Sequence, residues 1–459
     1  MRALSRQAQL RLWGVIGLVV SLPGMAIAAE GWQAGFASTK ITPEGPVWMS
    51  GYASRDRPAE GTRTELWAKV TALQDSRGKL GLLISMDVVG MGKAVSDAIC
   101  DPLMQELELT RSQIVINASH THTGPVVGDN LSTMYFLSEE QQAAVRQYTS
   151  QLIDKVIRCA MRAANSKVKV DIRYGVGQSR FGVNRRNNPE MLVPKRRFEG
   201  QLQGPVDYSV PVLRFVNEKD RTVGILFGYA CHATTLSDYQ WSGDYPGYAQ
   251  KFLQARFPEA VAQFFAGCGA DINPLPRREP RLAVQYGAAL AQAVAETLDG
   301  VMEPVLPQLQ TSFVSEDLFF DRIPSRDLLR SQVESKDRFV ASRAQKWLKV
   351  LDGGKAIPSG HAYPVSWWRL GSSVDLVGMG GEVVVEYALA LREKYGSSVW
   401  AMGYSHDVMA YIPSRRIWDE GGYEGASSMI YYGLPDRWSG TVEEDVLRII
   451  GRARAMLGP

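Results

Sequence analysis

Residues 113–125, QIVINASHTHTGP, join an apolar strand to a polar turn that carries two histidines. The run Gln113–Ala118 has the length of a buried strand, and Gly124-Pro125 forces the chain to turn after it. Because side chains alternate along a strand, a continuing strand would project His120 and His122 from the same face. The segment therefore predicts a sheet-based fold with a metal or acid–base site at the end of a strand.

Strand and helix patterns alternate on both sides of this segment. Two hairpins are expected, one from Leu66–Gln74 with Leu80–Val89 and one from Val210–Val216 with Thr222–Cys231. The expected helices are Ala94–Leu107, a long helix after the capping box of Ser138 and Gln141, Pro246–Arg256 and Arg281–Leu298. The sequence predicts an α/β (mixed α+β) fold: a single large domain of mixed β-sheets with hairpins covered by helices, and a charged surface insertion at Asp321–Gly354.

The composition is that of a globular protein. The chain has 459 residues, of which 45% are hydrophobic and 22% charged, and its formal net charge is +3. So small a charge, without a basic run, argues against nucleic acid as the main partner. The chain has only five histidines, so their positions carry information.

The N-terminus has the pattern of a secretory signal peptide, predicted at residues 1–28. Three arginines precede an apolar run from Leu12 to Leu22, and Ala26-Ile27-Ala28 forms a small-x-small cleavage site. A retained N-terminal anchor is the alternative. Removal of these residues takes away three positive charges and leaves the chain formally neutral. No later run reaches the roughly 18 apolar residues of a membrane span, so we expect an exported protein, periplasmic or secreted, without a transmembrane span.

The four cysteines are Cys100, Cys159, Cys231 and Cys268. In an exported chain they could form two disulfides, but each lies in an apolar run, where a buried thiol behaves as a small hydrophobic group. If one disulfide forms, Cys100 with Cys159 is the expected pair.

A third histidine and a glutamate also follow apolar strands. His232 follows an apolar strand that ends at Cys231, and it is either a metal ligand or a core histidine satisfied by hydrogen bonds. Catalytic zinc takes two or three imidazoles and often a carboxylate. Glu382, after Gly380-Gly381, is the best candidate, although an acid at the start of a helix is also favoured by the helix dipole.

Together these motifs resemble the neutral, non-lysosomal ceramidases. The resemblance lies in the segments His120–Pro125, Cys231–Thr234, Gly381-Glu382, Met49–Ala53 and Gly422–Ser427, and it spans roughly residues 35 to 440.

The resemblance implies a zinc centre and an active site around it. The implied zinc ligands are His120, His232, Glu382 and Tyr411. The implied catalytic residues are His122 as a proton shuttle or oxyanion donor, Tyr423 as an oxyanion donor and Arg185 as the active-site arginine. Asp244 is expected to orient a ligating histidine.

Two departures from the family pattern bear on the substrate. Asn273 stands where the family has an active-site serine; an asparagine can donate a hydrogen bond to a substrate but cannot act as a nucleophile. The chain also ends soon after Ser427, so residues 29–459 are expected to form a zinc hydrolase catalytic domain without the family's C-terminal β-sandwich domain.

The function implied is that of an exported zinc-dependent amidohydrolase. It would cleave the N-acyl amide bond of a ceramide-like sphingolipid or related N-acyl compound by attack of zinc-bound hydroxide. The expected partner is thus a small amphipathic N-acyl substrate, met in transient contact with a membrane surface. Two alternatives stay open: a zinc hydrolase of the same fold that acts on an ester or lactone, and a non-catalytic exported binding protein.

Overall fold

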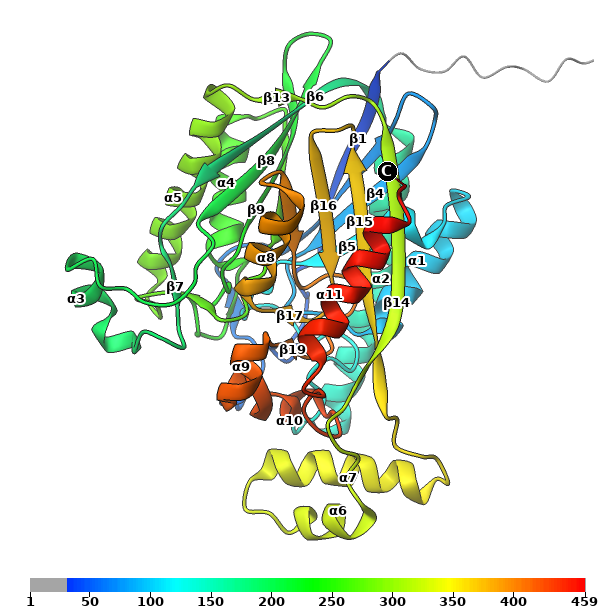
Figure 1. The fold of residues 1–459 in the computed structure, drawn as a ribbon, viewed down its shortest axis with the longest axis vertical. Helices are drawn as coiled ribbons and strands as arrows, with labels where there is room; N and C mark the ends of the chain where they lie inside the picture. The colour runs from blue at the N-terminus through cyan, green and yellow to red at the C-terminus, as the bar shows by residue number, and fades with distance from the viewer. Residues whose placement is uncertain (1–30, 459) are drawn as a thin grey trace, which may run out of the picture.

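The computed structural model describes residues 31–458, which form layers of helix, sheet, sheet and helix (Figure 1). The predicted signal peptide at residues 1–28 lies outside the described residues. The predicted mixed α/β fold, with sheets and hairpins covered by helices, is confirmed.

The larger sheet has the strand order β11-β9-β8-β6-β1-β3-β4-β5, with β13 beside β6. Its strands are β1 (Trp32–Lys40), β3 (Trp67–Gln74), β4 (Leu80–Met86), β5 (Ile114–Ala118), β6 (Val168–Gln178), β8 (Ser209–Asn217), β9 (Thr222–Tyr229), β11 (Val261–Ala266) and β13 (Glu303–Pro304). Both predicted hairpins are confirmed, because β3 pairs antiparallel with β4, and β8 with β9. The edge strands β5 and β11 run parallel to their neighbours, and each parallel pair is joined by a helix.

The two edges of this sheet come together where β5 and β11 end. The side chain of Asn117, on β5, accepts a hydrogen bond from the Ala266 N–H on β11 at 2.9 Å. The loops that follow β5 and β9 therefore emerge in the same region. This closure places segments far apart in the sequence around one site.

Four helices cover one face of the larger sheet: α1 (Lys93–Glu106), α2 (Glu139–Asn165), α4 (Asp244–Arg256) and α5 (Pro280–Asp299). The predicted capping box is confirmed at the start of α2, where Ser138 and Gln141 bond reciprocally. Val156 of α2 and Leu290 of α5 are fully buried in one core with Val70 of the sheet.

The second sheet, β14 (Leu309–Phe319), β15 (Gly360–Leu370), β16 (Val374–Met379) and β18 (Val399–Met402), packs on the other face. Val115 of β5 and Trp368 of β15 share the core between the sheets. The outer layer contains α8 (Val385–Tyr395) and α11 (Val442–Ala455). His361 lies near the start of β15.

The charged segment Asp321–Gly354 is a surface insertion, as predicted. It forms α6 (Arg326–Val333) and α7 (Arg338–Asp352), which project from one end of the molecule in Figure 1. Leu329 and Trp347 lie in a small core of their own. The remaining short elements are β2 (Gly61–Thr62), β7 (Gly182–Asn184), α3 (Val193–Phe198), β10 (Gln240–Trp241), β12 (Ile272–Pro274), β17 (Glu382–Val383), β19 (Tyr411–Ile412), α9 (Arg415–Glu420), a π-helix (Tyr423–Ser427) and α10 (Met429–Tyr432).

The expected Cys100–Cys159 disulfide is wrong. All four cysteines are buried free thiols, and Cys100 and Cys159 pack as small apolar groups between the helices and the sheet. Within residues 31–458, no helix combines the length and the apolar character that crossing a membrane requires.

Candidate metal centre and active site

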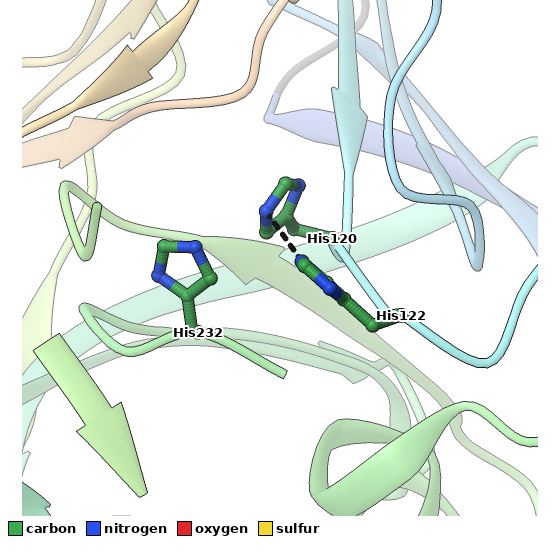
Figure 2. A group of neighbouring side chains, drawn as sticks. All are labelled: His120, His122 and His232. Carbon is green, nitrogen blue, oxygen red and sulfur yellow. Dashed lines mark hydrogen bonds between the residues drawn. The ribbon is translucent and has the colours of Figure 1, made fainter. Parts of the chain in front are cut away.

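His120 and His122 lie in the turn after β5, and their imidazoles enter one buried cluster (Figure 2). Their Nε2 atoms are 3.1 Å apart. The imidazoles converge as expected, but for a different reason. His120 has a φ of +59°, in the left-handed region, so the extended strand ends before it. The chain then runs beside the segment that follows β9, where the His122 N–H donates to the Ala233 carbonyl at 3.1 Å.

His232 supplies the third imidazole of the cluster (Figure 2). It follows β9, and its backbone N–H donates to the Ile272 carbonyl at 2.9 Å, which holds it against β12. The ring centroids of His120 and His232 are 4.7 Å apart. Each of the three histidines offers a ring nitrogen, and these atoms all lie within 4.8 Å of one another.

Backbone carbonyls fix the orientation of two of these rings. His120 Nδ1 lies 2.6 Å from the Val89 carbonyl oxygen, and His232 Nδ1 lies 2.8 Å from that of Gly269. Because a carbonyl oxygen only accepts, each Nδ1 carries the proton and donates it. The Nε2 atom of each ring is therefore an acceptor: that of His120 lies 3.1 Å from His122 Nε2, and that of His232 lies 3.3 Å from the Tyr411 hydroxyl.

Glu382 brings a carboxylate to the same point. Its Oε2 lies 3.1 Å from His120 Nε2 and 3.1 Å from His232 Nε2. Its Oε1 accepts a hydrogen bond from the Tyr432 hydroxyl. The expectation that Glu382 starts a helix is wrong: it lies in β17, α8 begins only at Val385, and the Val385 N–H is held by Asp271.

Tyr411 completes the group from β19, which pairs with β17 so that Tyr411 lies opposite Glu382. Its hydroxyl is 3.3 Å from His232 Nε2 and accepts a hydrogen bond from Arg185 Nη2 at 3.1 Å. All four residues predicted as zinc ligands thus meet, although they come from four separate segments.

The electrostatics of the cluster favour a neutral imidazole at His232 and a protonated phenol at Tyr411. Burial, reinforced by the nearby Arg185, lowers the pKa of His232 to about 4. Burial and the charge of Glu382 raise the pKa of Tyr411 well above its usual value.

The residues present fit a divalent cation. Glu382 Oε2 is buried and accepts no hydrogen bond within residues 31–458. Two imidazole lone pairs face it at 3.1 Å with no proton between them, an arrangement that repels unless a cation lies among the three atoms. Two ligands bound at about 2.0–2.1 Å to a tetrahedral zinc lie about 3.3 Å apart, close to the spacing seen. Donors of this kind, with Nδ1 held by carbonyls, are typical of zinc sites.

The residues predicted to act in catalysis surround this cluster. Arg185 Nε donates to Glu424 at 2.7 Å, and its Nη1 donates to Asn273 Oδ1 at 3.3 Å. Tyr423, in the π-helix, has its ring centroid 5.3 Å from that of Tyr411. His122 lies on the opposite side, with its ring centroid 4.8 Å from that of Tyr52.

The role expected for Asp244 is wrong. Its carboxylate accepts hydrogen bonds from the backbone N–H groups of Leu236 and Tyr245, at 2.8 and 2.6 Å, so it shapes the loop after His232 and touches no imidazole. Sequence reasoning also missed two tyrosines. Tyr432 bonds to Glu382, and the Tyr404 ring stacks on His120 with centroids 4.3 Å apart. Neither has a neighbouring motif that would have signalled it.

Comparison with known proteins identifies the family of this chain. Residues 32–295 match the family described as neutral/alkaline non-lysosomal ceramidase, N-terminal. The chain belongs to this ceramidase family. The matched region contains His120, His122, Arg185 and His232, whereas Glu382, Tyr411 and Tyr423 lie beyond it.

Curated relatives of the ceramidase family include the neutral ceramidase of Oryza sativa, 24% identical over 249 residues, and neutral ceramidase 1 of Arabidopsis thaliana, 26% identical over 255 residues. Each match covers 53% of this chain but only 31% and 32% of the relative, so the chain matches about a third of their length.

The fold likeness extends further than the sequence match. The crystal structure of neutral ceramidase from Pseudomonas aeruginosa superposes with a TM-score of 0.73 at 18% identity. It covers 93% of this chain and 75% of that one.

Proposed function

We propose that this protein is an exported zinc-dependent hydrolase that cleaves the N-acyl amide bond of a ceramide-like sphingolipid or a related N-acyl compound. The observation that carries the proposal is the convergence of two imidazole lone pairs on the unbonded Oε2 of Glu382, in a chain of the ceramidase family. Export rests on the signal-peptide pattern of residues 1–28.

His120, His232, Glu382 and Tyr411 would hold the zinc. A zinc ion bound there lowers the pKa of a water molecule toward about 7 and polarises a carbonyl oxygen. Hydrogen bonds fix the orientation of three of these ligands. The Val89 and Gly269 carbonyls orient the two rings, and Tyr432 orients the carboxylate.

His122 is placed to carry a proton between water and the leaving amine. Burial, reinforced by His120 and His232, lowers its pKa well below the usual value, so the ring is neutral and can accept a proton. Its Nδ1 is buried and has no hydrogen-bond partner within residues 31–458. Gly51 leaves room for this atom, because a Cβ at Gly51 would lie 2.5 Å from it.

Tyr423 and Arg185 are placed to bind the substrate carbonyl as it gains negative charge. The Tyr423 side chain is 41% exposed, so its hydroxyl can reach a substrate. Glu424 fixes the Arg185 guanidinium, and that group lies over the rings of Tyr411 and Tyr423 at 5.7 and 5.8 Å from their centroids. Donors set in advance where charge develops lower the barrier of acyl transfer. Asn273 holds Arg185 in place, and no nucleophilic side chain is needed.

The test is the zinc content and the amide hydrolysis of the purified protein. We expect about one zinc per chain and release of fatty acid from C8 ceramide, with both lost in His232→Ala. His361→Ala is the matched control, since His361 is partly exposed and bonds Asp407 at 2.9 Å, away from the cluster. No zinc in the wild-type protein, or full activity in His232→Ala, contradicts the proposal.

A further inference from the structure

A cavity of about 530 Å³ opens beside the metal cluster, and most of the residues that line it are charged or carry a side-chain amide. Of the ten residues that line it, seven are charged or carry a side-chain amide. Leu275 and Pro189 are the aliphatic members of the lining, and Tyr423 is its aromatic residue. An alkyl chain gains about 0.8 kcal/mol per CH₂ against an apolar wall, and a chain in this cavity would instead lie beside several charged groups.

The carboxylates of the wall are already engaged. Glu424 accepts from Arg185 Nε at 2.7 Å and from Arg186 Nη1 at 2.6 Å. Glu190 Oε2 lies 3.1 Å from both Nε and Nη2 of Arg277. Three arginines thus face two glutamates in the lining, and the wall keeps one positive charge in excess.

Two side chains of the wall, Asn273 and Arg277, have N–H groups that make no hydrogen bond within residues 31–458. Asn273 Oδ1 is held by Arg185 Nη1, so the hydrogens on its Nδ2 have no partner within residues 31–458. Arg277 uses Nε and Nη2 on Glu190, and its Nη1 makes no hydrogen bond within the same residues. Side-chain exposure of Arg277 is 16%, so water satisfies this guanidinium only in part. These unbonded groups are hydrogen-bond donors, so they suit a ligand that carries several hydrogen-bond acceptors.

Arg185 forms part of the wall between the cavity and the metal cluster. This residue lines the cavity, and its Nη2 lies 3.1 Å from the Tyr411 hydroxyl, which is 3.3 Å from His232 Nε2. A group bound in the cavity and an amide bound at the cluster would therefore both lie beside Arg185.

We infer that this cavity binds a carboxylate of the substrate, with Arg277 and Asn273 as its donors, so that the protein cleaves N-acyl amino acids in preference to ceramide. This inference rests on the proposed hydrolase function and narrows its substrate. Hydrogen bonds from a guanidinium to a carboxylate are about twice as strong as neutral ones and select for charge. Arg277 is the residue that determines specificity; it sets substrate binding and takes no part in bond cleavage.

The test compares three amides with the same acyl chain: N-octanoylglycine, N-octanoylglycinamide and C8 ceramide. The zinc-loaded protein is assayed for release of octanoate. We expect kcat/KM for N-octanoylglycine to exceed the other two at least tenfold. Equal or better hydrolysis of the glycinamide or of ceramide overturns the inference and leaves the hydrolase function intact.

Arg277→Gln removes one of the open donors, and Arg278→Gln is its matched control. Arg278 is the next residue, is 61% exposed and approaches the same Glu190 at 3.9 Å, but does not line the cavity. We expect Arg277→Gln to abolish the preference for N-octanoylglycine mainly through a higher KM for that compound, and Arg278→Gln to keep the preference. An equal effect of both substitutions overturns the inference.

If none of the three amides is hydrolysed, calorimetric titration separates the two claims. Tighter binding of N-octanoylglycine than of the glycinamide, lost in Arg277→Gln, keeps the carboxylate site and refutes the hydrolase function. Equal binding of both compounds, or binding of neither, overturns the carboxylate site as well.

Discussion

The hydrogen bond from Tyr432 to Glu382 offers a sharp test of the metal centre, because Tyr432 lies outside the ligand set. Tyr432→Phe removes only the hydroxyl and leaves Glu382 Oε1 buried without that donor. A hydrogen bond to a charged group contributes about 1.5–3 kcal/mol. Loss of such a support to a metal ligand costs about 10–100-fold in metal affinity, which is about 1.4–2.7 kcal/mol. The two estimates agree, so we expect the Kd for zinc to rise 10–100-fold.

The assay is competition for zinc against a chromophoric chelator at neutral pH. Tyr431→Phe is the matched control, because it deletes the hydroxyl of the adjacent tyrosine, which makes no hydrogen bond within residues 31–458. An unchanged zinc Kd in a Tyr432→Phe protein with a normal circular dichroism spectrum refutes the reasoning. The same holds if Tyr431→Phe weakens zinc binding equally.

Three further predictions follow from single contacts. Tyr423→Phe removes a donor to the developing oxyanion, and steady-state kinetics should show kcat lower by about 10²–10³ with KM nearly unchanged. Gly51→Ala brings a Cβ within 2.5 Å of His122 Nδ1 at a φ of +94° and should lower kcat by about 10², whereas Gly45→Ala, with open space around it, should not. Burial lowers the pKa of Lys69 to about 8, so its native state binds fewer protons than the unfolded state. Urea unfolding should therefore show the wild type gaining stability over Lys69→Met as the pH rises from 8 to about 10.5, by about 3 kcal/mol in all.

Local patterns in the sequence were enough to predict the hairpins, the capped helix α2 and the charged insertion. The hairpin of β3 and β4 depends on a turn between two adjacent strands, and the start of α2 depends on Ser138 and Gln141, three residues apart. Such features need no information from distant residues. They also placed His120 and His232 correctly at the ends of buried strands.

Contacts between distant segments could not be predicted in this way. The Gly-Gly-Glu sequence suggested a helix start at Glu382, but Asp271, more than a hundred residues earlier, holds the first N–H of α8 and leaves Glu382 in β17. Cys100 and Cys159 lie in one core without bonding, because their separation depends on how α1 packs against α2. The supporting roles of Tyr404 and Tyr432 likewise arise only when the sheets close around the site.

The central claim is that His120, His232, Glu382 and Tyr411 bind one zinc ion, with His122 nearby as a proton carrier. The most direct measurement is anomalous X-ray diffraction from crystals of the zinc-loaded protein, above and below the zinc absorption edge. The account predicts one edge-dependent peak bonded to Nε2 of His120 and His232 and to Glu382 Oε2, with the Tyr411 oxygen as the fourth ligand. A peak held by the three histidines, with Glu382 outside bonding distance, would contradict it, as would the absence of any peak at the cluster.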